Sequence, residues 1–353
     1  MTNAFGTPVV GRLLAHLNIG VSIFFLISGF LLYRPFIAHR AAAGPAAPAT
    51  RDYARRRILR IYPAYWFALA ALVIVPGLTG VLGGQWLGMV ALVHALPVYD
   101  TRACMDAPLG CGLAHTWSLV VELTFYAVLP LYVSGSERLS RGLSTRRWMQ
   151  AQLVFLAILS VSSVMLRYGV SEPTLAKVVS GSFLGYIWWF ALGMGTAVLS
   201  VGLGSAQPRP IRLIVTRPAL SWSLAAAAYV GLCVWLPASP FLFDREQELG
   251  AHVAFGGVAA LLLLPVVFRA GPSRVPHRLL ENRYVAWLGL ISYGIFLWHY
   301  AIAIELGSAG LDLPFGLALP ATIVLTVCAA AVSYFVVERP ALRLKHRGPR
   351  RAR

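Results

Sequence analysis

Nine apolar runs dominate the chain, and each is long enough to cross a lipid bilayer as a helix. A spanning helix needs about 20 mostly apolar residues, because each residue rises 1.5 Å and the hydrocarbon core is about 30 Å thick. The runs centre on residues 19–38, 58–80, 115–133, 149–168, 177–200, 219–237, 250–270, 283–305 and 315–337. They predict an all-α, polytopic transmembrane bundle of about nine spanning helices.

The composition agrees with a membrane protein that has no soluble domain. Of the 353 residues, 58% are hydrophobic and 12% are charged, and a soluble domain carries about twice that charged fraction. The formal net charge of +17 would suit nucleic acid if it lay along one soluble face. The basic residues instead lie between the apolar runs, as the positive-inside rule describes. We therefore predict one membrane domain over residues 1–340, a basic tail over 341–353, and no nucleic-acid partner.

Loop charges orient the spans. Basic loops at 134–148, 201–218 and 271–283 alternate with acidic loops at 238–249 and 306–313. This alternation predicts a multi-pass protein of the cell membrane whose C-terminus is cytoplasmic.

A weaker tenth run over residues 82–98 complicates this topology. Segments 39–60 and 134–148 are both basic, although three apolar runs separate them. We resolve the conflict by interpreting 82–98 as a re-entrant or interfacial segment, which places the following loop outside. Cys104 and Cys111 lie in that loop, where an oxidising compartment would permit a disulfide; the sequence favours neither the bonded nor the free state.

Two arginines stand at the entrance of the second run. Arg57 and Arg60 directly precede an apolar stretch that begins at Ile61. A planar, permanently charged guanidinium can bind two phosphate oxygens at once, so we favour a phosphate-bearing ligand. An orientation signal and contact with lipid phosphates are the alternatives.

Glu122 and His299 are ionisable groups within predicted spans, where such groups are costly and often functional. Ser118 and Glu122 share a helix face at i,i+4 spacing, and a carboxylate in a low-dielectric site suits proton transfer. A structural glutamate bonded to a neighbouring helix is the alternative. His299 lies toward the outer end of its run, where it suits either an acceptor site or an interfacial hydrogen bond.

The remaining candidate residues lie near the outer ends of their runs. His16 precedes the first run as either a base at the outer surface or a solvated residue, while Ser22, Phe25 and Gly29 form a face that lets another helix approach closely. His115 and Trp117 flank Thr116 just before the third run. No P-loop, HExxH, paired CxxC or GxSxG motif is present, so we expect no metal and no bound cofactor.

Five segments together resemble the membrane acyltransferase-3 family, the bacterial O-acyltransferases of glycans, lipids and macrolides. Residues 20–30 are similar to its GVDxFFxxSGF helix, 57–63 to RxxRIxP, 116–122 to TWSLxxE, 292–299 to SYxxYLxH, and 338–340 to ExP. Each segment alone is weakly specific, but all five occur in the family's order.

The resemblance implies transfer of an acyl group, usually acetyl, from cytoplasmic acyl-CoA to a hydroxyl of a glycan or lipid acceptor. Acyl-CoA would be a co-substrate. The family's RxxR arginines are implicated in handling this donor, and they match Arg57 and Arg60. Glu122 would orient a histidine base, with Trp117, Ser118 and His115 around the substrate. We expect Glu122 and His299 near the end of the bundle opposite the arginines.

Two departures from the family pattern leave three interpretations open. Members usually begin with a further helix that bears an arginine and a catalytic histidine, which this chain lacks, and many carry Asp where Ser22 stands. In the first interpretation, which we favour, the chain begins at an internal methionine of a longer product. In the second, it is a short form with His16 or His115 as the base. The third interpretation is a non-catalytic transporter or flippase of an acylated or anionic lipid. The acceptor and the oligomeric state are not encoded in any motif.

Overall fold

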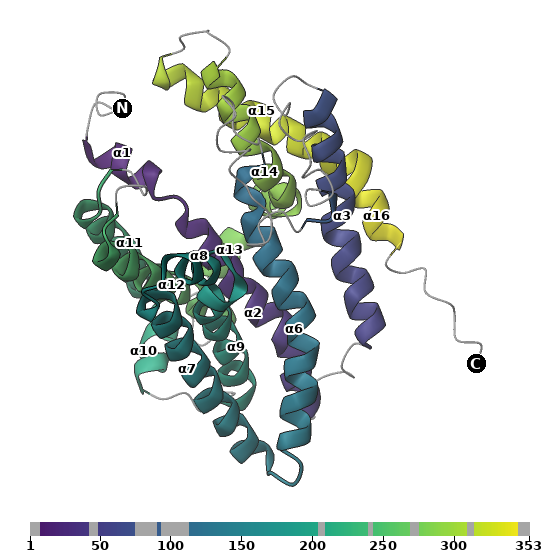
Figure 1. Cartoon of the computed structure of the whole chain (residues 1–353), viewed down its shortest axis with the longest axis vertical. Coiled ribbons are helices and arrows are strands. Elements are labelled where there is room, and N and C mark those ends of the chain that lie inside the picture. The colour runs from purple at the N-terminus through teal and green to yellow at the C-terminus, as the bar shows by residue number, and fades with distance from the viewer. Residues whose placement is uncertain are drawn as a thin grey trace. The chain divides into compact units, whose positions relative to one another are not determined.

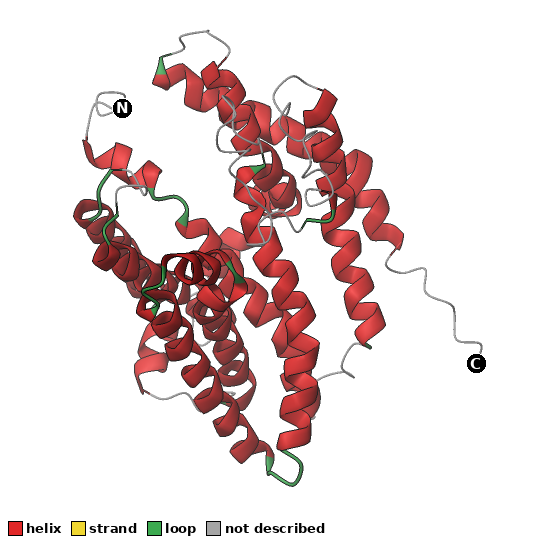
Figure 2. Ribbon diagram, in the orientation of Figure 1, coloured by secondary structure: helices red, strands yellow, loops and turns green. Residues whose placement is uncertain are grey.

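The structure is a computed structural model that describes residues 8–41, 49–74, 90–92, 113–203, 209–238, 243–268, 275–308 and 314–344. Within these residues the chain forms helices and no strands (Figure 2). Nine of the described helical segments are long and apolar enough to span a membrane: Ile19–Arg40, Thr50–Ile74, Trp117–Leu139, Thr145–Gly169, Phe183–Gly202, Pro218–Trp235, Arg245–Val267, Arg283–Gly307 and Phe315–Arg343. The predicted all-α transmembrane architecture is confirmed. Most of segment 82–98, together with Cys104 and Cys111, lies outside the described residues.

The helices pack as two compact units (Figure 1). Unit 1 comprises residues 1–48 and 127–280, and unit 2 comprises 49–126 and 281–353. The described helices of unit 1 are α1 (Pro8–Ala15), α2 (Ile19–Arg40), α7 (Thr145–Gly169), α8 (Pro173–Gly181), η2 (Phe183–Tyr186), α9 (Ile187–Gly202), α10 (Arg209–Thr216), α11 (Pro218–Trp235), α12 (Arg245–Val267) and α13 (Val275–Leu280). Those of unit 2 are α3 (Thr50–Ile74), η1 (Ala114–Thr116), α14 (Arg283–Ser308), α15 (Phe315–Ser333), η4 (Tyr334–Glu338) and α16 (Arg339–Arg343). Helix α6 (Trp117–Leu139) begins in unit 2 and continues in unit 1. The predicted single domain over 1–340 stays a prediction.

Unit 1 is centred on a close contact between α2 and α9. A side chain at Gly29 would collide with the carbonyl oxygen of Phe190, and one at Gly193 would collide with the backbone of Leu26. Beside these glycines, the Phe25 and Phe190 rings stack with their centroids 4.5 Å apart. The predicted small-residue face of α2 is therefore confirmed as a helix-packing surface.

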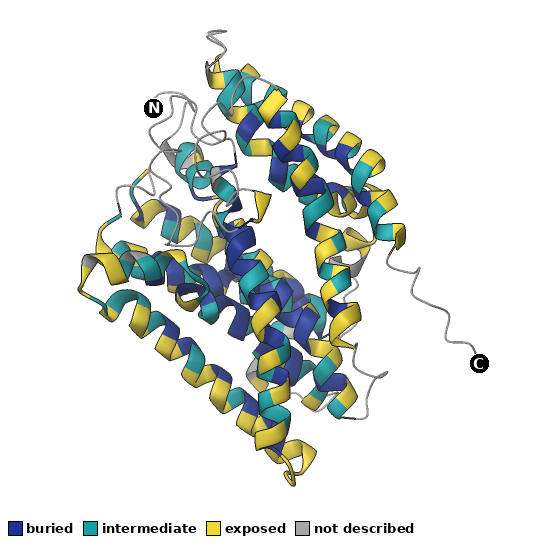
Figure 3. Cartoon of the chain, turned by 45° about the vertical axis from the view of Figure 1, so that its right-hand side comes forward, coloured by how far each residue is buried: buried dark blue, intermediate teal, exposed yellow. Residues whose placement is uncertain are grey.

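Several polar groups of unit 1 pair within the protein. The hydroxyls of Tyr33 and Tyr132 donate to the Gln152 side-chain oxygen at 2.8 Å and 2.5 Å. At the start of α12, Asp244 and Gln247 form a reciprocal capping box, which satisfies amides that have no partner inside the helix. Buried residues lie along the faces where helices meet, and exposed ones lie on the outer faces (Figure 3), as a chain surrounded by lipid requires.

Unit 2 brings α3, α14 and the C-terminal helices together. The Tyr293 hydroxyl of α14 donates to the Ile61 carbonyl oxygen of α3 at 2.9 Å. Gly294 lies against Ala330 of α15, where a Cβ would lie 2.9 Å from the Ala330 Cα. Helix α15 continues into a π-helical turn, η4, and π-helical turns often occur at functional sites.

We predict that Gly193→Ala destabilises the protein because its methyl group forces α2 and α9 apart. Overpacking of this kind costs about 1–3 kcal/mol. Gly195→Ala on the same helix is the matched control, since its Cβ would meet only Leu153, at 4.0 Å. Thermal melting of the two variants in detergent, followed by size-exclusion chromatography, checks the prediction. Equal melting temperatures would show that moving α2 and α9 apart costs no measurable stability.

Candidate active site

Unit 2 contains seven of the eight side chains that the sequence predicts at the site. Arg57 and Arg60 come from α3, His115 from η1, and His299 from α14. Trp117, Ser118 and Glu122 come from the first turns of α6. His16 belongs to unit 1.

His299 has one ring nitrogen fixed by the backbone. Its Nδ1 lies 2.7 Å from the Phe296 carbonyl oxygen and 3.1 Å from that of Ile295. A carbonyl oxygen only accepts hydrogen bonds, so Nδ1 carries the proton. In the neutral ring Nε2 then holds a lone pair, and the side chain is exposed. This is the state that a general base needs.

A second histidine ring lies against the first. The His115 ring centroid is 4.9 Å from that of His299, with the rings at 65°. His115 also contacts the rings of Phe296 and Tyr300, at 4.7 Å and 5.4 Å. The pairing joins two segments far apart in the sequence, and only their common outer-end position hinted at it.

The turn that carries His115 is held by two hydroxyls. Thr116 donates to the Leu113 carbonyl oxygen at 2.6 Å, and Ser118 donates to the His115 carbonyl oxygen at 3.2 Å. Ser118 is buried and Trp117 is half-buried. The Ser118 hydroxyl therefore positions the backbone of His115.

Glu122 is 2% exposed and has a hydrogen-bond donor one helical turn away. The Tyr126 hydroxyl donates to its Oε1. Tyr53 and Tyr293 are also within electrostatic reach of this carboxylate. Sequence reasoning missed Tyr126, although its i,i+4 spacing from Glu122 is a usable signal.

The two arginines of α3 face different partners. The Arg57 guanidinium lies 5.5 Å from the Tyr126 ring centroid and 5.9 Å from that of Tyr53, within cation–π range. Arg60 is exposed and interacts electrostatically with Glu338. Only one tyrosine separates Arg57 from Glu122, a shorter separation than the sequence led us to expect.

His16 is fully buried in unit 1, so the interpretation as a solvated residue is wrong. Its Nε2 lies 3.0 Å from the Pro237 carbonyl oxygen and its ring 5.6 Å from that of Phe243. Burial lowers the pKa of His16, and the hydrogen bond to Pro237 opposes that shift. Helix α1 is held there because the Tyr229 hydroxyl donates to the Leu13 carbonyl oxygen at 2.7 Å.

Among the described residues, no group of three or more histidine, cysteine, aspartate or glutamate side chains could hold a metal ion. The arrangement in unit 2 therefore offers a histidine pair, a buried carboxylate with a tyrosine donor, and two arginines. These are groups that suit proton transfer and the binding of an anionic ligand.

A family model described as an acyltransferase domain, acyltransferase-3, matches residues 2–338. The chain belongs to the acyltransferase-3 family. Membership confirms the resemblance and makes the chain a membrane acyltransferase. No solved structure matches it.

Three relatives from this family show how far the similarity extends. Exopolysaccharide production protein ExoZ of Rhizobium meliloti is 27% identical over 92% of this chain and 89% of its own length. Nodulation protein 10 of Rhizobium leguminosarum is 25% identical, over 92% and 82%. A putative peptidoglycan O-acetyltransferase of Bacillus subtilis, YrhL, is 24% identical over 91% of this chain and 50% of its own length.

We predict that Tyr126→Phe lowers the turnover of this acyltransferase about tenfold, because Glu122 loses the donor that orients it. Loss of the hydrogen bond should also cost about 0.5–1.5 kcal/mol of stability. Tyr132→Phe is the control: it removes a part-buried hydroxyl from the same helix, but one that bonds Gln152. Turnover and melting temperature are measured for both variants. If both variants lose turnover equally, Tyr126 has only a structural role.

Proposed function

We propose that the protein is an integral membrane O-acyltransferase that moves an acyl group, acetyl in the simplest case, from acyl-CoA to a hydroxyl of a glycan acceptor. Family membership supports the reaction class. The names of YrhL and ExoZ, a putative peptidoglycan O-acetyltransferase and an exopolysaccharide production protein, support a glycan acceptor. The observation that carries the proposal is the exposed His299, whose Nδ1 donates to the backbone so that Nε2 holds a lone pair.

In the proposed reaction, His299 Nε2 takes the proton of the acceptor hydroxyl while the hydroxyl oxygen attacks the thioester carbonyl carbon. The new C–O bond forms, the C–S bond breaks, and the CoA thiolate takes the proton back from the imidazolium. General base catalysis of this kind contributes about 10²–10⁴-fold in rate. His115, packed against the His299 ring, restricts its orientation.

The two arginines have different roles in this proposal. Arg60 is exposed and binds the phosphates of CoA, while Arg57 holds the Tyr126–Glu122 pair through the tyrosine ring. Helix α3 begins among basic residues, as cytoplasmic ends do. His299 lies 16 residues into α14, about 24 Å along a helix from its basic start. The donor's acyl end would therefore extend into the bundle toward His299, and the C-terminus would be cytoplasmic.

We expect His299→Asn to reduce turnover by about 10²–10⁴-fold without changing donor affinity. The asparagine amide can still donate to the backbone carbonyls that His299 Nδ1 contacts, but it offers no basic nitrogen in place of Nε2. His39→Asn, at an exposed position near the end of α2, is the matched control. Acetyl transfer to a glycan acceptor is measured with purified protein. Full turnover in His299→Asn would mean that His115 or His16, and not His299, is the general base.

We also expect saturable binding of acetyl-CoA that an Arg57→Ala/Arg60→Ala variant loses. The single variants should differ: Arg60→Gln raises the KM for the donor, and Arg57→Gln mainly lowers kcat. Arg56→Ala removes the same charge from an exposed neighbouring position of α3 and should change neither. Binding by isothermal titration and steady-state kinetics make the comparison. Absent or arginine-independent binding by a folded protein would favour a transporter of anionic lipid instead.

A further inference from the structure

A pocket of about 400 Å³ lies in unit 1, and its lining includes none of the residues that the proposed reaction uses. It lies where α7 ends and is lined by residues of α8 and of the first turn of α12. This is the end of α7 opposite its basic start, the end that the loop charges place outside the membrane. The lining residues are Arg167, Tyr168, Val170, Ser171, Ala176, Ser180, Arg245 and Glu248. The volume is in the range of small-ligand sites.

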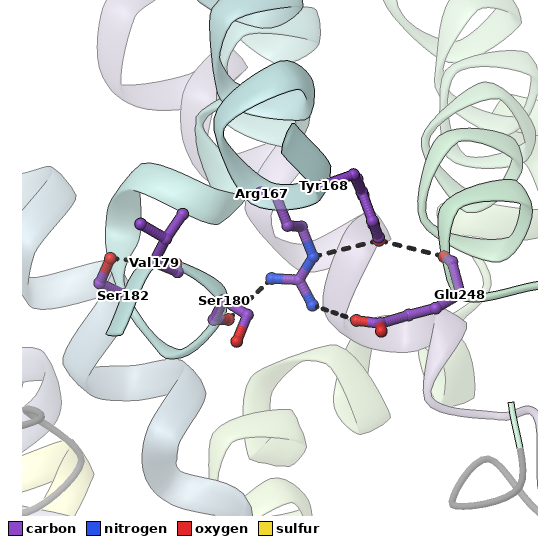
Figure 4. A network of polar contacts seen from close by, with 6 residues as sticks. All are labelled: Arg167, Tyr168, Val179, Ser180, Ser182 and Glu248. Carbon is purple, nitrogen blue, oxygen red and sulfur yellow. Dashed lines mark hydrogen bonds and ion pairs between the residues drawn. The ribbon is translucent and has the colours of Figure 1, made fainter. Parts of the chain in front are cut away.

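Arg167, one of these lining residues, is held by polar contacts with residues of α7, α8 and α12 (Figure 4). Its Nε lies 3.1 Å from the Tyr168 hydroxyl, its Nη1 2.7 Å from the Ser180 carbonyl oxygen, and its Nη2 2.9 Å from Glu248 Oε1. Its side chain is 9% exposed, and its guanidinium lies 4.7 Å from the Tyr186 ring centroid. These contacts join α7, α8 and α12, so the shape of the pocket is set before a ligand arrives.

Two charged groups of α12 remain open to a ligand. The Glu248 side chain is 48% exposed and engages Arg167 through Oε1. Its Oε2 has no hydrogen-bond partner within the described chain. Arg245 is exposed, and one Nη of its guanidinium donates to the Tyr168 carbonyl oxygen. Arg245 can therefore still bind an anion, and Glu248 can still accept hydrogen bonds from hydroxyls.

The charged residues of the pocket lining favour one class of ligand. Glu248 neutralises Arg167, which leaves Arg245 as the cation available to a ligand. A guanidinium binds a carboxylate through two parallel hydrogen bonds. A phosphate monoester carries more negative charge than a carboxylate and would lie near the half-exposed Glu248 carboxylate, which repels it. A ligand with one carboxylate and several hydroxyls matches both groups.

We propose that this pocket binds an acidic sugar residue, with its carboxylate on Arg245 and its hydroxyls on Glu248. The proposal rests on the transferase function proposed above only for its biological meaning: the sugar would belong to a glycan of the acceptor class and would be held at a residue other than the one acylated. Binding requires neither donor nor catalysis. A failure of transfer and a failure of sugar binding can therefore be told apart.

The test is isothermal titration of the full chain in phosphatidylcholine nanodiscs with a glucuronate-containing disaccharide. The neutral glucose disaccharide of the same linkage is the comparison ligand. We expect the acidic disaccharide to bind at least tenfold more tightly, and Arg245→Gln to remove that difference. Arg212→Gln makes the same charge change at an exposed position of α10 and should leave binding unchanged.

A change in the ligand keeps the test decisive if Arg245→Gln does not fold. The methyl ester of the glucuronate disaccharide lacks the negative charge, so its affinity for the unaltered protein should fall at least tenfold. Absent binding of the acidic disaccharide, equal affinity of acid and ester, or equal binding by a folded Arg245→Gln variant overturns the proposal. Displacement of the acidic disaccharide by equimolar glycerol phosphate would also overturn it, because the pocket would then prefer the phosphate of a lipid headgroup.

Discussion

A charged or polar side chain inside a membrane span must find its partner within the protein, because lipid offers none. In unit 1 the buried Gln152 oxygen accepts from two tyrosines, and the Arg167 guanidinium meets a hydroxyl, a carbonyl oxygen and a carboxylate. In unit 2 the carboxylate of Glu122 accepts from Tyr126. Together with the close α2–α9 contact at Gly29 and Gly193, these pairings fix which helix faces meet.

The same requirement separates structural polar groups from a reactive one. The guanidinium of Arg167 is engaged by each element around it, so it holds three helices together. His299 differs because its backbone bonds take Nδ1 and do not involve Nε2, and its side chain is exposed. A side chain held firmly at one atom and left open at another is pre-organised for proton transfer. The exposed carboxylate oxygen of Glu248 has the same asymmetry, and there it suits ligand binding.

The sequence was sufficient to predict the nine spans because span length depends only on bilayer thickness. It was sufficient for the small-residue face at Gly29 because close approach requires the absence of a side chain. The direction of Arg57 was not predictable. Arg57 and Arg60 are both near the helix entrance, but they point toward Tyr126 and Glu338, and that choice depends on how α3 is rotated against its neighbours. The His115–His299 pair was missed for the same reason: it is a tertiary contact.

The last family segment shows how a short motif can set local geometry. Glu338, in the π-helical turn η4, is 6% exposed and interacts electrostatically with Arg60. Two residues later Pro340 lacks an amide hydrogen, so the carbonyl oxygen of Val336 cannot receive its usual helical bond. A wider turn just before the proline accommodates that missing donor. The Glu-Arg-Pro segment thereby combines a π-helical turn with a buried carboxylate that interacts with an arginine of α3.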